Sequence, residues 1–190
     1  LGGVVYSARV RVAGTACEAS VWTTDSAVTA STSAGVMASL RMTATAGQQT
    51  GTVSQAASYD GALVAACLPV NTATTGSASL TLTGSQAGHH PYSPSTRAGH
   101  TAVESADWES DSSVVCRVSQ GCASTHTLVL SVGRQASTST AVLSYDAPLV
   151  SSAAASNIAA TGSASMSVVG NELGGVVYSA RVRVAGTACE

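Results

Sequence analysis

Leu1–Glu18 reads LGGVVYSARVRVAGTACE, and Leu173–Glu190 repeats the same eighteen letters. An identity of this length predicts that the chain samples a longer protein whose sequence recurs every 172 residues. Inside the stretch, Ala8–Val12 alternates apolar residues with two arginines, which places both arginines on one face of a β-strand. The stretch therefore predicts a repeated fold built from strands.

The 172-residue step divides into two steps of 86 residues. The tripeptide Ser58–Asp60 returns at 144–146, and Trp22 returns as Trp108. Two related kinds of 86-residue unit therefore alternate. A repeat of this length is typical of small domains joined in series rather than of a solenoid with shorter repeats.

The composition excludes several classes of function. Only 9% of the residues are charged, the net charge is −2, and all eight basic residues are arginines without a basic run. We therefore expect no nucleic-acid partner. No apolar run approaches the roughly 20 residues of a membrane-spanning helix, so we expect no membrane insertion of this segment.

The prevailing hydrophobic pattern has a period of two residues, and clusters of Gly, Asn, Asp and Ser interrupt it. About seven short strands per unit predict an all-β sandwich of immunoglobulin type. The strands expected from alternation, besides the one at 8–12, lie at 78–82, 114–118, 128–132, 141–145 and 164–168.

The repeat offset predicts the domain boundaries. Residues 61–146 form one complete unit, 1–60 are the C-terminal part of another, and 147–190 are the N-terminal part of the next, with 173–190 identical to 1–18. Because Ala147-Pro148 leads directly into the next predicted strand, we expect short, stiff joins and domains arranged as a rod.

Four stretches carry a resemblance to a known family: Pro148–Val150, Thr161–Gly170, Val182–Glu190 and Ser110–Cys116. In this order they resemble successive strands of the IPT/TIG domain. The resemblance implies an immunoglobulin-like fold. Such domains occur in cell-surface receptors, in DNA-binding transcription factors and as accessory modules of enzymes. Near-uniform tandem arrays of them are most similar to large secreted or cell-surface proteins, so we expect an extracellular or cell-surface location.

Five cysteines are candidates for disulfide bonds, with buried free thiols as the alternative: Cys17, Cys67, Cys116, Cys122 and Cys189. The resemblance implies a pair between two motif cysteines, but each unit here keeps only one of them. The partner position of Cys17 is Ala30, and that of Cys116 is Val103. Pairing within 61–146 and pairing between units both remain open.

His89, His90 and His100, with Glu104 nearby, raise the alternative of a zinc or copper site. We expect a solvated loop instead, because the second kind of unit lacks the histidines. The carboxylates around Trp108 similarly raise the alternative of a calcium loop, although a polar turn beside a buried tryptophan is the simpler expectation: Glu104, Asp107, Glu109 and Asp111.

Aromatic residues recur at the repeat offset, and we expect them to anchor the core rather than to form a sugar-binding platform: Trp22 and Trp108; Tyr6, Tyr92 and Tyr178; Tyr59 and Tyr145. No catalytic constellation is present, and no Gly-x-Ser-x-Gly turn marks a nucleophilic serine. We therefore expect no enzymatic activity, no metal and no cofactor.

The sequence favours a structural role, as a segment of a long extracellular filament, surface hair or stalk. Its partners would be other copies of the repeat, with O-linked glycans on the many serines and threonines. Two alternatives remain: an adhesin or glycan-binding surface module, and accessory domains of a secreted enzyme.

Overall fold

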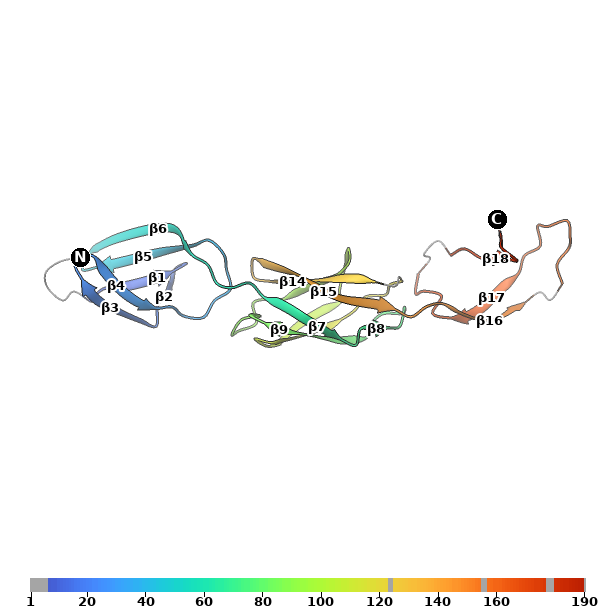
Figure 1. The fold of residues 1–190 in the computed structure, drawn as a ribbon, viewed down its shortest axis with the longest axis horizontal. Coiled ribbons are helices and arrows are strands. Elements are labelled where there is room, and N and C mark those ends of the chain that lie inside the picture. Colours follow the sequence, from blue (N-terminus) through green and yellow to red (C-terminus); the bar gives the residue numbers. More distant parts are fainter. Residues whose placement is uncertain (1–6, 123–124, 155–156, 177–179, 190) are drawn as a thin grey trace.

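The computed structural model describes residues 7–122, 125–154, 157–176 and 180–189. Every regular element in these ranges is a β-strand, and Figure 1 shows three groups of strands that follow one another along the longest axis. The all-β prediction is confirmed. No helix in the described ranges is long and apolar enough to cross a lipid bilayer.

The central group of strands is a sandwich of two sheets. One sheet has the order β12-β13-β9-β7 and the other the order β11-β10-β14-β15-β8. The strands are β7 (Leu63–Leu68), β8 (Asn71–Thr72), β9 (Ser79–Ser85), β10 (Ser95–Ala98), β11 (Thr101–Ala102), β12 (Ser105–Ser110), β13 (Ser113–Arg117), β14 (His126–Val132) and β15 (Gln135–Tyr145). All pairs are antiparallel except β8 with β15.

The core lies between these two sheets, because alternate residues of each strand point inward. Leu80 and Leu82 of β9 are each 2% exposed. They belong to one hydrophobic cluster with the inward residues of β13 and β14, namely Val114, Cys116, Leu128, Leu130 and Val132. The period-two pattern of the sequence thus becomes the interior of an immunoglobulin-like sandwich.

The first group holds part of the same sandwich. Its strands are β1 (Arg9–Val12), β2 (Thr15–Ala16), β3 (Ala19–Thr24), β4 (Ala27–Ser31), β5 (Leu40–Ala46) and β6 (Gln49–Ala57). They form a four-stranded sheet of order β2-β1-β5-β6 and a separate pair β3-β4.

The last group contains two separate hairpins. One joins β16 (Leu149–Ala154) to β17 (Ser167–Asn171), and the other joins β18 (Arg183–Val184) to β19 (Thr187–Ala188). The bounds of β1, β2, β3 and β4 precede those of β10, β11, β12 and β13 by 86 residues, and β16 follows β7 by the same step. The first group therefore corresponds to the later strands of the sandwich and the last group to its earlier strands, and β18–β19 repeats β1–β2.

One expected strand differs from the structure. The sequence predicts a strand at 164–168, whereas β17 begins at Ser167. In the central sandwich, Ser79 and Leu80 begin β9 by pairing with β13 and not with β7. Their counterparts, residues 165 and 166, face no such third strand in the described residues, so the regular pairing begins later.

Candidate functional site

Each tyrosine near the end of a unit fixes a loop by the same contacts. Tyr145 Oη donates to the carbonyl of Ser119 at 2.8 Å. A Cβ atom on Gly121 would lie 2.5 Å from the Tyr145 ring, so the loop passes closely over it. Eighty-six residues earlier, Tyr59 Oη donates to the carbonyl of Ser33 at 2.5 Å. These loops close the ends at which consecutive units meet.

The first junction lies between the first group of strands and the central sandwich. Val36 is 5% exposed and belongs to the hydrophobic cluster of the central unit. It lies against Gly88 and Gly133, which precede β10 and follow β14 in the chain. Gln135 Nε2 also donates to the carbonyl of Tyr59 at 3.0 Å. One apolar side chain of the first unit thus completes the core of the next.

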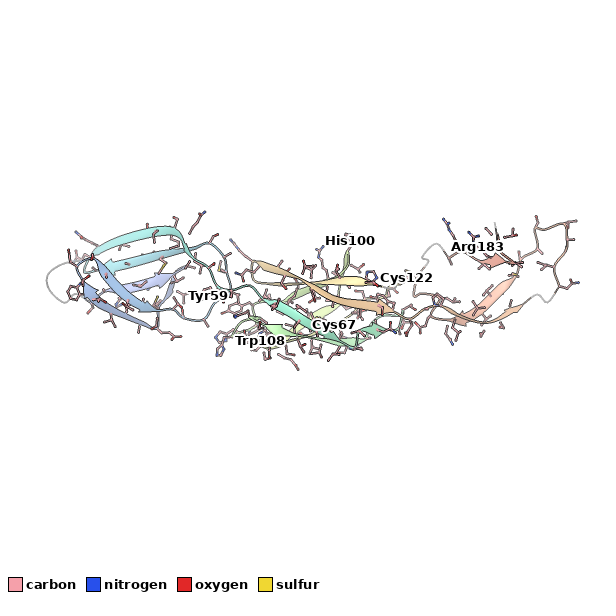
Figure 2. All side chains as sticks on the ribbon, viewed as in Figure 1. Tyr59, Cys67, His100, Trp108, Cys122 and Arg183 are labelled. Carbon is pink, nitrogen blue, oxygen red and sulfur yellow. The ribbon has the colours of Figure 1, made fainter. Side chains whose placement is uncertain are left out.

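Tyr59 lies at the same junction, where Tyr92 lines the groove beside it. Burial raises the pKa of Tyr59, and the neighbouring Cys17 and Tyr92 raise it further. Figure 2 shows Tyr59 between the first and second groups of strands. The tyrosine is therefore neutral and serves as a packing and hydrogen-bonding residue.

The second junction, between the central sandwich and the last group of strands, is polar. The Glu172 carboxylate accepts hydrogen bonds from the amide nitrogen of Thr74 at 2.7 Å and from its Oγ1 at 2.8 Å. These hydrogen bonds hold the pKa of Glu172 below its usual range. At the repeat offset, Gln86 stands in place of Glu172 and Ala160 in place of Thr74, so neither partner of this contact recurs one unit away.

Trp108 and Asp111 hold the loop that leads from β9 toward the first junction. Trp108 Nε1 donates to the carbonyl of Gly88 at 3.2 Å, and Asp111 Oδ1 accepts from the Gly88 amide at 2.9 Å. The Trp108 side chain packs against the core cluster. Asp111 therefore holds the backbone of a turn.

The counterpart of Trp108 in the first unit has no such partner in the described part of the chain. Trp22 Nε1 is buried and meets no hydrogen-bond acceptor there. A buried N–H without an acceptor costs about 1–3 kcal/mol. Trp22 therefore marks a place where a carbonyl oxygen would be stabilising.

Two other carboxylates near Trp108 lie beside serines of neighbouring strands and turns. Glu104 accepts from Ser77 Oγ at 3.0 Å, and Glu109 accepts from Ser113 Oγ at 3.3 Å. Among the described residues, no group of three or more His, Cys, Asp and Glu side chains is arranged to hold a metal ion.

The histidines do not gather in one place. The rings of His89 and His90 meet edge to face at 5.7 Å, and His90 meets Tyr92 at 6.4 Å. His100 lies in the turn between β10 and β11, and Figure 2 shows it across the sandwich from Trp108.

The candidate disulfide cysteines are distributed over buried and exposed places. Cys67 and Cys116 are buried, and burial raises the pKa of both thiols. Cys17 is half-buried, while Cys122 and Cys189 are exposed, and the described residues contain no disulfide bond. Pairing within 61–146 and pairing between units both stay predictions.

The sequence alone does not identify several residues of these junctions. Val36 and Thr74 carry no motif, and their roles depend on a neighbouring unit. Glu172 did carry a signal, because the repeat offset pairs it with the uncharged Gln86. His126 meets Tyr145 edge to face at 5.6 Å and was also not singled out. Tyr6 and Tyr178 lie outside the described residues.

Comparison with solved structures gives weak overall similarity. Plexin A4, in its full extracellular region, has a TM-score of 0.42 and 14% identity, covering 73% of this chain and 14% of its own. The titin I9–I11 tandem has a TM-score of 0.36 and 11% identity, and the match covers 74% of this chain and 55% of that one. A third structure is SGBP-B of a Bacteroides ovatus mixed-linkage glucan utilization locus, in complex with a mixed-linkage heptasaccharide. It has a TM-score of 0.34 and 12% identity, and the match covers 75% of this chain and 39% of that one. The chain thus spans only part of each.

No curated protein sequence matches the chain significantly. The family comparison does match: residues 63–145 fit the model of the IPT/TIG domain. The match runs from the first residue of β7 to the last residue of β15, and so spans both sheets of the central sandwich. The resemblance inferred from the motifs is confirmed, and residues 63–145 of this chain are an IPT/TIG domain.

Proposed function

We propose that the chain is a structural repeat segment of a long extracellular filament, surface hair or stalk. In this role its immunoglobulin-like domains pack end to end as a rod and transmit load rather than carry out a reaction. Other copies of the same repeat are its partners, and O-linked glycans on outward serines and threonines would solvate the surface.

The burial of Val36 carries the proposal. A flexible string of domains needs no shared core, whereas Val36 of one unit is buried in the hydrophobic cluster of the next. The Tyr59–Gln135 and Thr74–Glu172 hydrogen bonds add directional contacts at the two junctions. Contacts of this kind restrict bending, which suits a stiff fibre.

The extracellular location belongs to the same proposal. It is supported by the family match and by the low charge and abundant Ser and Thr. We also propose that this segment has no enzymatic activity, because neither the sequence nor the geometry of the described residues supplies a reason to expect one.

Electron microscopy of native material tests the proposal. If each domain is roughly 30–40 Å long, two domains give an axial repeat on the order of 60–80 Å. A power spectrum along the filament should show this repeat, and antibodies against residues 61–146 should decorate it at the same spacing. Isolated globular particles, or flexible strings that never form filaments, would contradict a structural fibre and favour an adhesin.

A further inference from the structure

The first unit presents three arginines on the outer face of one sheet. Arg9 and Arg11 of β1 are exposed, and the valine that follows each of them is buried. Arg41 of β5 is exposed between an inward leucine and an inward methionine. The register across β1 and β5 pairs Arg11 with Thr43, two residues along from Arg41. The three guanidinium groups therefore share one surface, which we call the basic face.

The complete central sandwich shows that this face is open to solvent. There the counterparts of the three arginines are Ser95, Arg97 and Thr127, and all three are exposed although both sheets of the unit are present. The exposure of the basic face is therefore a property of this sheet. The central unit differs in charge, because it keeps only one of the three arginines.

The central unit carries the opposite charge on its other sheet. Asp107 and Glu109 of the edge strand β12 are exposed, and Trp108 between them packs against the core, so both carboxylates face outward. We call this pair the acidic face. The first unit has Val21 and Thr23 at the equivalent positions, so each kind of unit carries one of the two charged faces.

We infer that the basic face of one copy binds the acidic face of a second copy, with the two chains side by side and offset by one unit. The inference rests on the proposed assembly of copies and specifies which surfaces meet. Complementary charges of this kind select the partner and the register. They also give a physical reason for the alternation of two kinds of unit along the chain.

The spacing of the charges fits this contact. Arg9 and Arg11 are two residues apart on one strand, and so are Asp107 and Glu109. Alternate residues of a strand lie about 7 Å apart, so two guanidinium groups can meet two carboxylates at the same time. Arginine suits this role, because its planar group binds a carboxylate through two parallel hydrogen bonds.

The two faces lie on different sheets of the sandwich. The strands β1 and β5 correspond to β10 and β14, whereas β12 belongs to the other sheet. A copy can therefore bind one neighbour through its basic face and another through its acidic face, which is a heterologous contact that builds an open array. A contact of a few exposed ion pairs is weak by itself, and the repeats along a filament multiply it.

Zero-length cross-linking tests which surfaces meet, because the chain contains no lysine. Arg9→Lys keeps the charge and places a side-chain amine in the basic face. Arg97→Lys does the same on the central unit and is the matched control. A water-soluble carbodiimide joins an amine to a carboxylate that it touches. Each full 190-residue chain is mixed with its isotope-labelled form, so that mass spectrometry identifies links between copies.

At low salt the Arg9→Lys chain should link to Asp107 or Glu109 of a second copy about fivefold more often than the Arg97→Lys chain does. The excess should vanish near 1 M salt, where the screening length falls to about 3 Å. Equal links in the two chains, or links spread evenly over other carboxylates, would overturn the contact.

Light scattering on the same samples separates this contact from assembly itself. Association of copies without the expected links would overturn the pairing of the two faces and leave assembly intact. Copies that stay monomeric at low salt would also overturn it, and retention on a sulfated polysaccharide would then identify a glycan as the occupant of the basic face. Microscopy of native filaments would still test the structural role separately.

Discussion

The described parts of the two copies of the eighteen-residue repeat form the same local structure. In each copy a short hairpin forms, and an arginine Nη1 donates to the carbonyl of a glycine three residues later. The distance is 3.0 Å from Arg11 to Gly14 and 3.1 Å from Arg183 to Gly186. The residue pairs across the two hairpins are also equivalent. Local sequence therefore suffices to form this hairpin.

The surroundings of the two copies differ. Val10 and Val12 are 7% and 3% exposed, whereas their copies Val182 and Val184 are 37% and 39% exposed. The cause is β5, which pairs with β1 but has no counterpart beside β18 in the described residues. Formation of the hairpin is therefore a local property, whereas burial of its side chains depends on strands distant in the sequence.

An aspartate at equivalent positions of the central and last groups should give the largest difference in unfolding free energy. Val64→Asp puts an unpaired carboxylate into the central core and should cost about 3 kcal/mol or more of unfolding free energy. Val150→Asp, at the exposed counterpart, should change it by about 0.5 kcal/mol or less. Urea denaturation of both variants, followed by circular dichroism, measures the difference. Equal losses would mean that the last group is as fully packed as the centre.

Alanine in place of the glycine that faces each tyrosine ring should destabilise the first and central units alike, because this contact is complete in both. Gly121→Ala and Gly35→Ala each place a Cβ against a tyrosine ring, 2.5 and 2.6 Å from its nearest atom. We expect a loss of about 1–3 kcal/mol for each. Thermal unfolding is the measurement, and Gly51→Ala is the control, since no atom lies within 4 Å of its Cβ. A loss in only one unit would show that the two loops differ.

A pair of tryptophan substitutions isolates one hydrogen bond. Trp108→Phe removes the bond to the Gly88 carbonyl, whereas Trp22→Phe removes an N–H that has no acceptor among the described residues. Both lose similar ring area, so the unfolding free energies should differ by about 1 kcal/mol, with Trp108→Phe the more costly. Chemical denaturation monitored by circular dichroism tests this. If Trp22→Phe costs as much as Trp108→Phe, the indole of Trp22 already has an acceptor in solution.

The smallest expected effect concerns the polar junction. Because the Glu172 pKa is lowered, its contacts with Thr74 contribute above the unfolded pKa and are lost as the pH falls through the lowered value. A carbon-detected NMR titration should therefore show a lower midpoint for Glu172 in the native chain than in Thr74→Val. Glu172→Gln should remove the pH dependence of junction contacts. Identical midpoints in the two chains would mean that this junction is open in solution.

Much of the fold could be predicted because it depends on local alternation. Ala8–Val12 gives β1 almost residue for residue, and 114–118 and 128–132 coincide closely with β13 and β14. The family motifs add the order of the strands. The later start of β17 could not be foreseen, because it depends on whether a third strand lies beside Ser165 and Met166.

The candidate site was less predictable for the same reason. The histidines and carboxylates drew attention as chemical groups, yet the residues that join the units are an ordinary valine and a threonine. Val36 becomes a core residue only when Gly88 and Gly133 of the next unit face it. The Thr74 contact needs Glu172, 98 positions away in the chain. The repeat offset marks Glu172 as different from Gln86, but it does not show which residue Glu172 contacts.

The position of Val36 has a mechanical consequence. If a tensile force unfolded the first unit, Val36 would leave the hydrophobic cluster of the central unit, and that unit would lose part of its core. Rupture of one domain would thus weaken its neighbour, as in nearest-neighbour models of repeat proteins. Such an array would yield in bursts rather than one domain at a time, and it would remain stiff until the first domain failed.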